Sequence, residues 1–283
     1  MQYRTLSNGV KLPMIGYGTF QIRDAVQCGQ CVSEALEAGY RLFDTAASYE
    51  NEAAIGRALR GSGLPRKEWF VTTKLWVQDA GYDDTLRAFE HSMKTLGLDY
   101  IDLYLIHQPF GDYYSAWRAM ERLYQEGAIR AIGVSNFPPE RLVDLCMNQE
   151  VRPVVNQIEI HPFFQQSTAL RVMEDYGVIP QAWGPFSEGQ YDIFHHKILT
   201  KIAEKHGKTT EQVILRWHLQ RNIPVIPKTV HQERMAENLD IFDFELTAKE
   251  MESIAGMDIG HSEIIDHHCF CTARQLNSVK IHE

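Results

Sequence analysis

The chain has 283 residues, of which 44% are apolar and 23% are charged, and its formal net charge is −9. These proportions exclude collagen-like and disordered low-complexity sequences, and the length suits one large domain or two small ones. An acidic chain without a run of Lys and Arg is a poor ligand for nucleic acid. No apolar run approaches the roughly 18 residues of a membrane helix, and the first residues lack the form of a signal peptide. We therefore expect a cytoplasmic protein with no nucleic-acid or membrane partner, as a monomer or weak dimer.

Short runs rich in Val, Ile, Phe, Trp and Tyr alternate with longer amphipathic segments. The first predicted element is a hairpin over Tyr3–Leu12 with Asn8-Gly9 at its turn. Eight strands are then predicted: Met14–Gly18, Arg41–Thr45, Trp69–Leu75, Ile101–His107, Ile129–Ser135, Val154–Glu159, Val178–Trp183 and Ile223–Pro227. The predicted helices are Asp24–Ala38, Asn51–Gly61, Asp83–Leu96, Tyr114–Glu126, Pro139–Asn148, Ser167–Tyr176, His195–Gln220, one that begins near His231, and Thr247–Met257.

Eight strand-then-helix units without a linker between them favour a closed (β/α)₈ TIM barrel, and a doubly wound sheet is the alternative. Several strands are nearly continuous apolar runs, as parallel strands covered on both faces should be. We expect one α/β barrel domain over residues 1–283. The segment from Gly260 to Glu283 is predicted to be an irregular tail that lies across the active-site face.

Polar residues gather where the predicted strands end, which is the active-site face of such a barrel. Asp44 and Lys74 end the second and third strands, Tyr49 follows on a loop, and His107 ends the fourth. A charged Lys74 is expected to lower the pKa of the Tyr49 phenol and make it a usable proton donor. This set of side chains has neither metal-ligand spacing nor a nucleophile–base pair, so it suits carbonyl reduction by a nicotinamide.

Six segments in order, LFDTAASYENE, TTKLW, DLYLIHQP, AIGVSNF, NQIEIHP and IPKTVHQERMAEN, resemble the aldo-keto reductases along essentially the whole chain. They are most similar to the bacterial branch that includes 2,5-diketogluconate and methylglyoxal-type reductases. The resemblance implies NADPH-dependent reduction of aldehydes and ketones to alcohols, with Asp44, Tyr49, Lys74 and His107 as the catalytic tetrad. It also places the cofactor contacts on Ser135, Asn136, Gln157, Trp183, Lys228, Thr229, Arg234, Glu237 and Asn238.

The expected phosphate site also follows from the residues themselves. Lys228 precedes a helix N-terminus, where free N–H groups favour an anion. Arg234 and Asn238 are four residues apart and are predicted to share one helix face. Two local cations in an acidic chain fit the 2′-phosphate, so NADPH is predicted in preference to NADH.

The substrate mouth is predicted to be lined by Phe20, Trp76, Gln108 and Phe110. Gln108 stands where many family members have Trp, and Phe20 also replaces a frequent Trp. Gly184 stands where many members have Ser, so it offers the pyrophosphate only its backbone. These departures leave the physiological carbonyl open.

Neither of the two cysteine motifs is expected to carry chemistry. Cys28 and Cys31 lie within a predicted helix and are expected to be structural, because a redox pair would begin a helix after a strand. His267, His268, Cys269 and Cys271 are dense enough to suggest zinc, but they lack a second ligand pair at a known spacing, so no metal is expected.

Two functions besides carbonyl reduction stay open. One is a non-catalytic NADPH-binding sensor or regulatory subunit, which would keep the barrel and the cofactor site. The other is a lyase or isomerase that uses Lys74 as a Schiff base.

Overall fold

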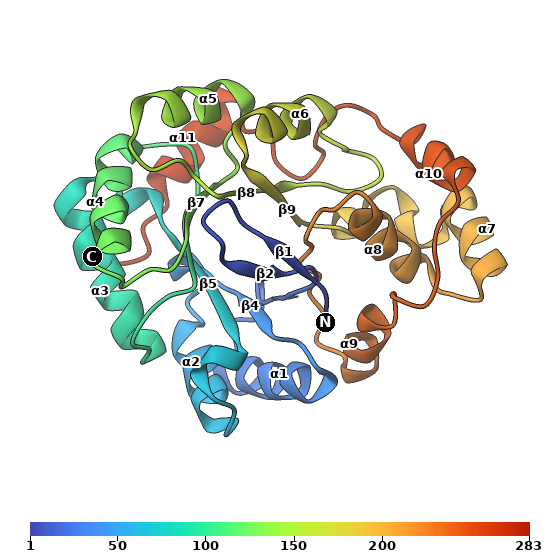
Figure 1. The fold of residues 1–283 in the computed structure, drawn as a ribbon, viewed down its shortest axis with the longest axis horizontal. Coiled ribbons are helices and arrows are strands. Elements are labelled where there is room, and N and C mark those ends of the chain that lie inside the picture. The colour runs from blue at the N-terminus through green and yellow to red at the C-terminus, as the bar shows by residue number, and fades with distance from the viewer.

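The computed structural model describes all residues, 1–283. Seven parallel strands pair in chain order around a central barrel (Figure 1). The eighth position is filled by Val225, which bridges Ile15 on one side and Ala182 on the other and so closes the ring. The predicted (β/α)₈ barrel is therefore confirmed. Its strands are β3 (Tyr17–Gly18), β4 (Leu42–Asp44), β5 (Phe70–Leu75), β6 (Leu103–Ile106), β7 (Ile132–Ser135), β8 (Val155–Glu159) and β9 (Ile179–Trp183).

The predicted N-terminal hairpin is also present, as β1 (Tyr3–Thr5) paired antiparallel with β2 (Lys11–Pro13). Gly9 turns the chain at φ 85°, a conformation that glycine adopts without steric cost. Leu6 and Leu12 pack against the apolar side chains inside the barrel. The hairpin lies across the barrel in Figure 1 and covers the end opposite the polar strand ends.

The alternation of side chains along each strand separates two apolar clusters. In β6, Leu103 and Leu105 belong to the cluster inside the barrel, whereas Tyr104 and Ile106 belong to the larger cluster between the strands and the helices. Successive side chains of a strand point to opposite faces, so this phase fixes which polar residues at the strand ends face inward.

Helices surround the barrel and cover its outer face (Figure 1). Asp24 caps the first of them through its side chain, which accepts from the Gln27 N–H, and Thr247 and Glu250 form a capping box on the tenth. No helix has both the length and the apolar character that crossing a membrane requires. The helices are α1 (Ala25–Ala38), α2 (Glu52–Gly61), α3 (Tyr82–Leu96), α4 (Tyr113–Gln125), α5 (Pro139–Asn148), α6 (Ser167–Tyr176), α7 (Lys197–His206), α8 (Thr210–Gln220), α9 (Gln232–Leu239), α10 (Ala248–Ala255) and α11 (Phe270–Ser278).

Three predicted elements were wrong in detail. The single helix predicted over His195–Gln220 is two helices, because Gly207 ends α7 at φ 63° and Thr209 begins α8 with a capping box. The tail is not wholly irregular, since it contains α11. The predicted strand Ile223–Pro227 is reduced to the bridges that Val225 makes.

Candidate active site

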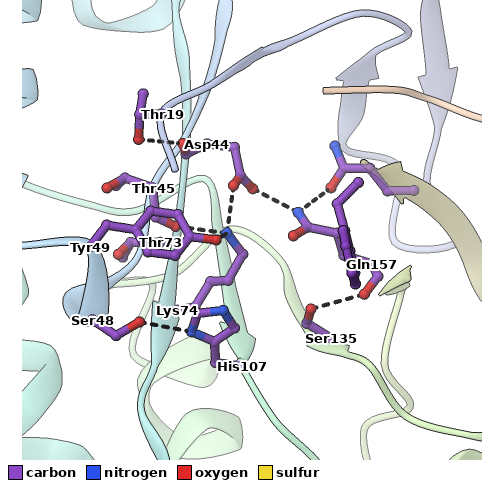
Figure 2. Close-up of polar contacts among 12 residues, drawn as sticks. Thr19, Asp44, Thr45, Ser48, Tyr49, Thr73, Lys74, His107, Ser135 and Gln157 are labelled. Carbon is purple, nitrogen blue, oxygen red and sulfur yellow. Dashed lines mark hydrogen bonds and ion pairs between the residues drawn. The ribbon is translucent and has the colours of Figure 1, made fainter. Parts of the chain in front are cut away.

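The inward phase of β4 and β5 places Asp44 and Lys74 inside the barrel at the polar end of the strands. Leu42 and Phe70 belong to the interior cluster, and Asp44 and Lys74 follow them by two and four residues. Lys74 Nζ lies 2.5 Å from Asp44 Oδ1 and also donates to the Thr45 carbonyl over 2.9 Å. Both charged side chains are buried. Figure 2 shows the ammonium between the carboxylate and the phenol of Tyr49.

Tyr49 ends the short 3₁₀ helix η1 (Ala47–Tyr49), and its Oη lies 3.2 Å from Lys74 Nζ. Burial raises the pKa of the Tyr49 phenol above its usual value, although the Lys74 charge acts in the opposite direction. Lys74 therefore acts on this pKa in the expected direction, but the net pKa is raised because desolvation of the phenolate outweighs the attraction of the ammonium. The phenol is protonated throughout the neutral range.

Burial and the neighbouring groups shift the pKa of each partner of the ion pair in opposite directions. Burial alone would lower the pKa of the Lys74 ammonium, but Asp44 and Tyr49 beside it raise the pKa above its usual value. Burial raises the pKa of the Asp44 carboxyl, against the contacts that it makes with Lys74 and Gln157. Lys74 is thus held as a cation next to the Tyr49 hydroxyl.

His107 lies beside the Tyr49 ring, after the end of β6. Its ring is 5.5 Å from the Tyr49 ring and 5.3 Å from Trp76, both edge to face. Burial and the nearby Lys74 charge hold the pKa of the imidazole well below its usual value, so His107 is neutral. Its Nδ1 lies 3.2 Å from the Ser48 hydroxyl (Figure 2).

Four of the predicted cofactor residues form one hydrogen-bonded group next to this tetrad. Gln157 Nε2 donates to Asp44 Oδ2 over 2.6 Å, and Ser135 Oγ donates to the Gln157 carbonyl over 2.9 Å. Asn136 Nδ2 donates to the His107 carbonyl, and Trp183 Nε1 donates to Asn136 Oδ1 over 2.8 Å. The structure therefore brings Ser135, Asn136, Gln157 and Trp183 together at the strand ends.

The predicted phosphate residues lie on the segment after Val225 and on α9, but their environments differ. The side chains of Lys228 and Arg234 are exposed and make no ion pair or hydrogen bond within the protein, and the backbone N–H groups of Lys228 to Val230 are also unpaired. Arg234 and Asn238 both lie on α9, four residues apart, but Asn238 is 3% exposed whereas Arg234 is exposed. Glu237 accepts a hydrogen bond from Thr209 Oγ1 over 2.6 Å.

The predicted mouth residues divide into two groups. The Phe20 ring, 49% exposed, lies 5.0 Å from Tyr49, and Trp76 lies against His107, so both line the site. Phe110 instead packs beside Arg141, and no ring contact joins it to Tyr49 or His107. Gln108 Oε1 lies 2.9 Å from His267 Nε2.

The tail covers this face through several hydrogen bonds. His267 bonds to Gln108, the Val279 carbonyl accepts from Trp76 Nε1 over 3.0 Å, and His282 bonds to Asp79 over 2.8 Å. His267 is thus engaged with Gln108, and Cys269 caps the N-terminus of α11 through its sulfur.

Sequence reasoning missed two residues of the site. Gln181 accepts from Gln157 Nε2 over 2.9 Å, and its own Nε2 is buried without a partner. The strand pattern could have predicted Gln181, because this residue precedes Trp183 by two positions and therefore faces the inside of the barrel as Trp183 does. Ser48 gave no such signal, since its contact with His107 depends on the conformation of η1.

The comparisons with known proteins agree with this geometry. A model of the aldo/keto reductase family matches residues 14–259. The glyoxal reductase of Bacillus subtilis (strain 168) is 45% identical over 254 residues, which are 89% of this chain and 91% of that protein. The 9,11-endoperoxide prostaglandin H2 reductase of Trypanosoma cruzi (strain CL Brener) is 45% identical over 252 residues, which are 88% and 89% of the two chains.

A solved structure of the family has the same fold as this chain. The crystal structure of the Bombyx mori aldo-keto reductase, in complex with NADP, matches with a TM-score of 0.89 at 35% identity and covers 94% of this chain and 95% of that one. The family model, the two relatives and the shared barrel lead to one conclusion. This chain belongs to the aldo/keto reductase family.

Proposed function

We propose that the chain reduces aldehydes and ketones to alcohols with NADPH, with Tyr49 as the proton donor. The observation that carries this proposal is the position of Lys74 Nζ, 2.5 Å from the Asp44 carboxylate and 3.2 Å from the Tyr49 hydroxyl, at the polar end of the barrel. A cation held at this place favours the phenolate that forms when Tyr49 gives up its proton. Asp44 keeps the cation charged in a buried site.

His107 is proposed to orient the substrate carbonyl. A neutral imidazole whose Nδ1 accepts from Ser48 carries its proton on Nε2 and can donate it to an oxygen beside Tyr49. Two donors, the Tyr49 hydroxyl and His107 Nε2–H, would then polarise one carbonyl oxygen. Phe20 and Trp76 provide aromatic walls that limit water at this point.

The cofactor is NADPH, and it supplies the hydride. The residues present fit such a group: Gln181 Nε2 is a buried donor without a partner, and the N–H groups of Lys228 to Val230 are free. The proposed contacts of the nicotinamide end are Ser135, Asn136, Gln157 and Trp183. The proposed contacts of the 2′-phosphate and adenine end are Lys228, Thr229, Arg234, Glu237 and Asn238.

The same geometry weighs against a lyase or isomerase that uses Lys74 as a Schiff base. A nucleophilic amine must be neutral, whereas the pKa of Lys74 is raised and its ammonium donates to Asp44, Thr45 and Tyr49. A sensor or subunit that only binds NADPH has no need of the Tyr49–Lys74 pair. The intact tetrad therefore favours the reductase.

The names of the relatives extend the range of substrates to test. One relative is named for glyoxal and another, equally identical, for a prostaglandin endoperoxide. We therefore propose a carbonyl substrate without choosing its size or one compound. Gln108 and His267 make one side of the mouth polar, which favours carbonyls that carry a second oxygen.

The test is NADPH consumption by the purified protein against aldehydes, α-dicarbonyls, keto-sugars and ketosteroids, with NADH in parallel. We expect turnover with NADPH and much less with NADH. Tight NADPH binding without turnover of any carbonyl would contradict the reductase and favour the sensor or regulatory subunit. Trapping of a covalent substrate adduct on Lys74 by borohydride would contradict the reductase and favour the lyase or isomerase that uses a Schiff base.

A further inference from the structure

The segment from Pro227 to His231 leaves the barrel wall and leads into α9 without strand partners of its own. Its fixed contacts to the barrel come from β3. Gly18 N–H donates to the Pro227 carbonyl over 3.0 Å. A Cβ on Gly18 would lie 2.8 Å from the Ile226 carbonyl oxygen, so the close approach of the two segments requires glycine at this position.

The second contact comes from the neighbouring residue. Tyr17 is fully buried, and its Oη donates to the Thr229 carbonyl over 2.5 Å. No other hydrogen bond reaches this carbonyl. Burial raises the pKa of the Tyr17 phenol, so the hydroxyl stays protonated and remains a donor.

Thr229 transmits this constraint to the start of α9. Its Oγ1 accepts from the His231 N–H over 3.1 Å, and the His231 carbonyl then accepts from the N–H groups of Arg234 and Met235 in the first turn. A shift of Thr229 would move Lys228 on one side and the helix that carries Arg234 on the other. The two free cations therefore depend on one residue for their relative position.

The packing behind Tyr17 explains the cysteine motif of α1. The Tyr17 ring lies 5.7 Å from Tyr40, and Cys28 and Cys31 are buried in the same apolar cluster. Burial raises the pKa of the Cys28 thiol to about 12, and it also raises that of Cys31. Such thiols are poor nucleophiles at neutral pH, and they fill the space that keeps the Tyr17 ring in place.

We infer that Tyr17 is a positioning residue for cofactor choice: its hydrogen bond to Thr229 holds Lys228 and the first turn of α9 in the arrangement that binds a 2′-phosphate. The inference rests on the proposed function. The hydroxyl is remote in the chain from the tetrad and touches no reacting atom. It acts only through the segment that it fixes.

The test compares Tyr17→Phe with Tyr104→Phe. Tyr104 is a matched control because it is also a buried strand tyrosine, and its hydroxyl makes no hydrogen bond within the protein. In Tyr17→Phe we expect the Kd of NADPH to rise about fivefold to twentyfold, as loss of one buried hydrogen bond would give, while the Kd of NADH changes by less than about twofold and kcat at saturating NADPH is kept. Tyr104→Phe should leave both Kd values unchanged.

A NADPH Kd in Tyr17→Phe equal to that of the wild type would overturn the inference, as would equal losses for NADPH and NADH. Failure of the wild-type protein to bind NADPH would instead overturn the proposed function, so the two failures are distinguishable. Amide hydrogen exchange of the protein alone gives a second readout. The amides of Arg234 and Met235 should exchange faster in Tyr17→Phe, while the exchange of the α10 amides should not change. Unchanged exchange at Arg234 and Met235 would also contradict the inference.

Discussion

Lys74 contacts Tyr49 in two ways at once, since its Nζ lies 3.2 Å from the phenol oxygen and 4.8 Å from the centre of the ring. The ammonium is therefore attracted both to the negative face of the ring and to the charge that develops on the oxygen. This double contact fixes the phenol next to a cation that Asp44 keeps in place. A substitution of either Tyr49 or Lys74 should therefore also affect the position of the other side chain.

Tyr49→Phe should abolish most of the reduction and leave cofactor binding intact. The proton donor is lost while the ring and its packing against Phe20 and His107 stay, and a positioned general acid contributes about 10²- to 10⁴-fold. The measurement is kcat with a good carbonyl substrate, beside the NADPH Kd. Tyr3→Phe, at the opposite end of the barrel, is the control and should behave as the wild type. Turnover kept by Tyr49→Phe would remove this residue as the acid.

Breaking the buried ion pair on one side should cost more stability than removing it altogether. Asp44→Asn leaves the Lys74 ammonium buried without its counterion, which costs about 3–5 kcal/mol of unfolding free energy. Adding Lys74→Met removes that charge and should recover part of the loss, as measured by urea unfolding. Glu126→Gln, which breaks the exposed pair with Arg122, should cost less than about 1 kcal/mol. A double variant no more stable than Asp44→Asn alone would show that the pair is not the source of the loss.

Arg234→Ala should raise the Kd of NADPH much more than the Kd of NADH. The free guanidinium is proposed to meet the 2′-phosphate, and a charged hydrogen-bonded contact of this kind is worth about a 10- to 100-fold change in Kd. We expect that loss for NADPH and less than about a threefold change for NADH, measured by titration. Arg171→Ala removes an exposed arginine on α6 that likewise has no ion pair and should change neither value. Equal losses for both cofactors would mean that Arg234 does not meet the 2′-phosphate.

The rate of reduction should depend little on pH across the neutral range. The pKa of His107 is lowered, so the imidazole stays neutral until the pH falls well below about 6.5, and the pKa of Tyr49 is raised, so the phenol stays protonated until the pH exceeds about 10. A profile of kcat/KM for the carbonyl substrate should therefore be flat from about pH 6 to about pH 9. A fall centred near pH 6.5 would show that His107 titrates at its ordinary value and contradict the neutral imidazole.

Strand phase and strand ends were enough to predict most of the site. Asp44, Lys74, Gln157 and Trp183 each lie an even number of residues from an apolar position inside the barrel, which is why a sequence pattern could place them on one face. The order of the strands followed from the regular alternation of strand and helix. The resemblance to a known family then assigned the roles.

The remaining features depend on contacts between distant segments. The bond between Ser48 and His107 and the bond between Tyr17 and Thr229 join residues 59 and 212 positions apart, and no local pattern encodes them. The helix α11 is nine residues long and none of its residues is buried, so packing against the core does not account for it. The break between α7 and α8 is signalled by Gly207 and Thr209 but was obscured by continuous helical periodicity on both sides.

Closure of the barrel at Val225 also has a consequence for how the chain assembles. The edges of β3 and β9 remain open until residue 225 joins them, through bonds that include Gly16 N–H to the Val225 carbonyl over 2.8 Å. A ribosome-bound chain that ends before this residue carries a seven-stranded sheet with two unpaired edges, and open edges are templates for aggregation. Fragments that stop short of Val225 should therefore aggregate, whereas fragments that extend past α9 should not.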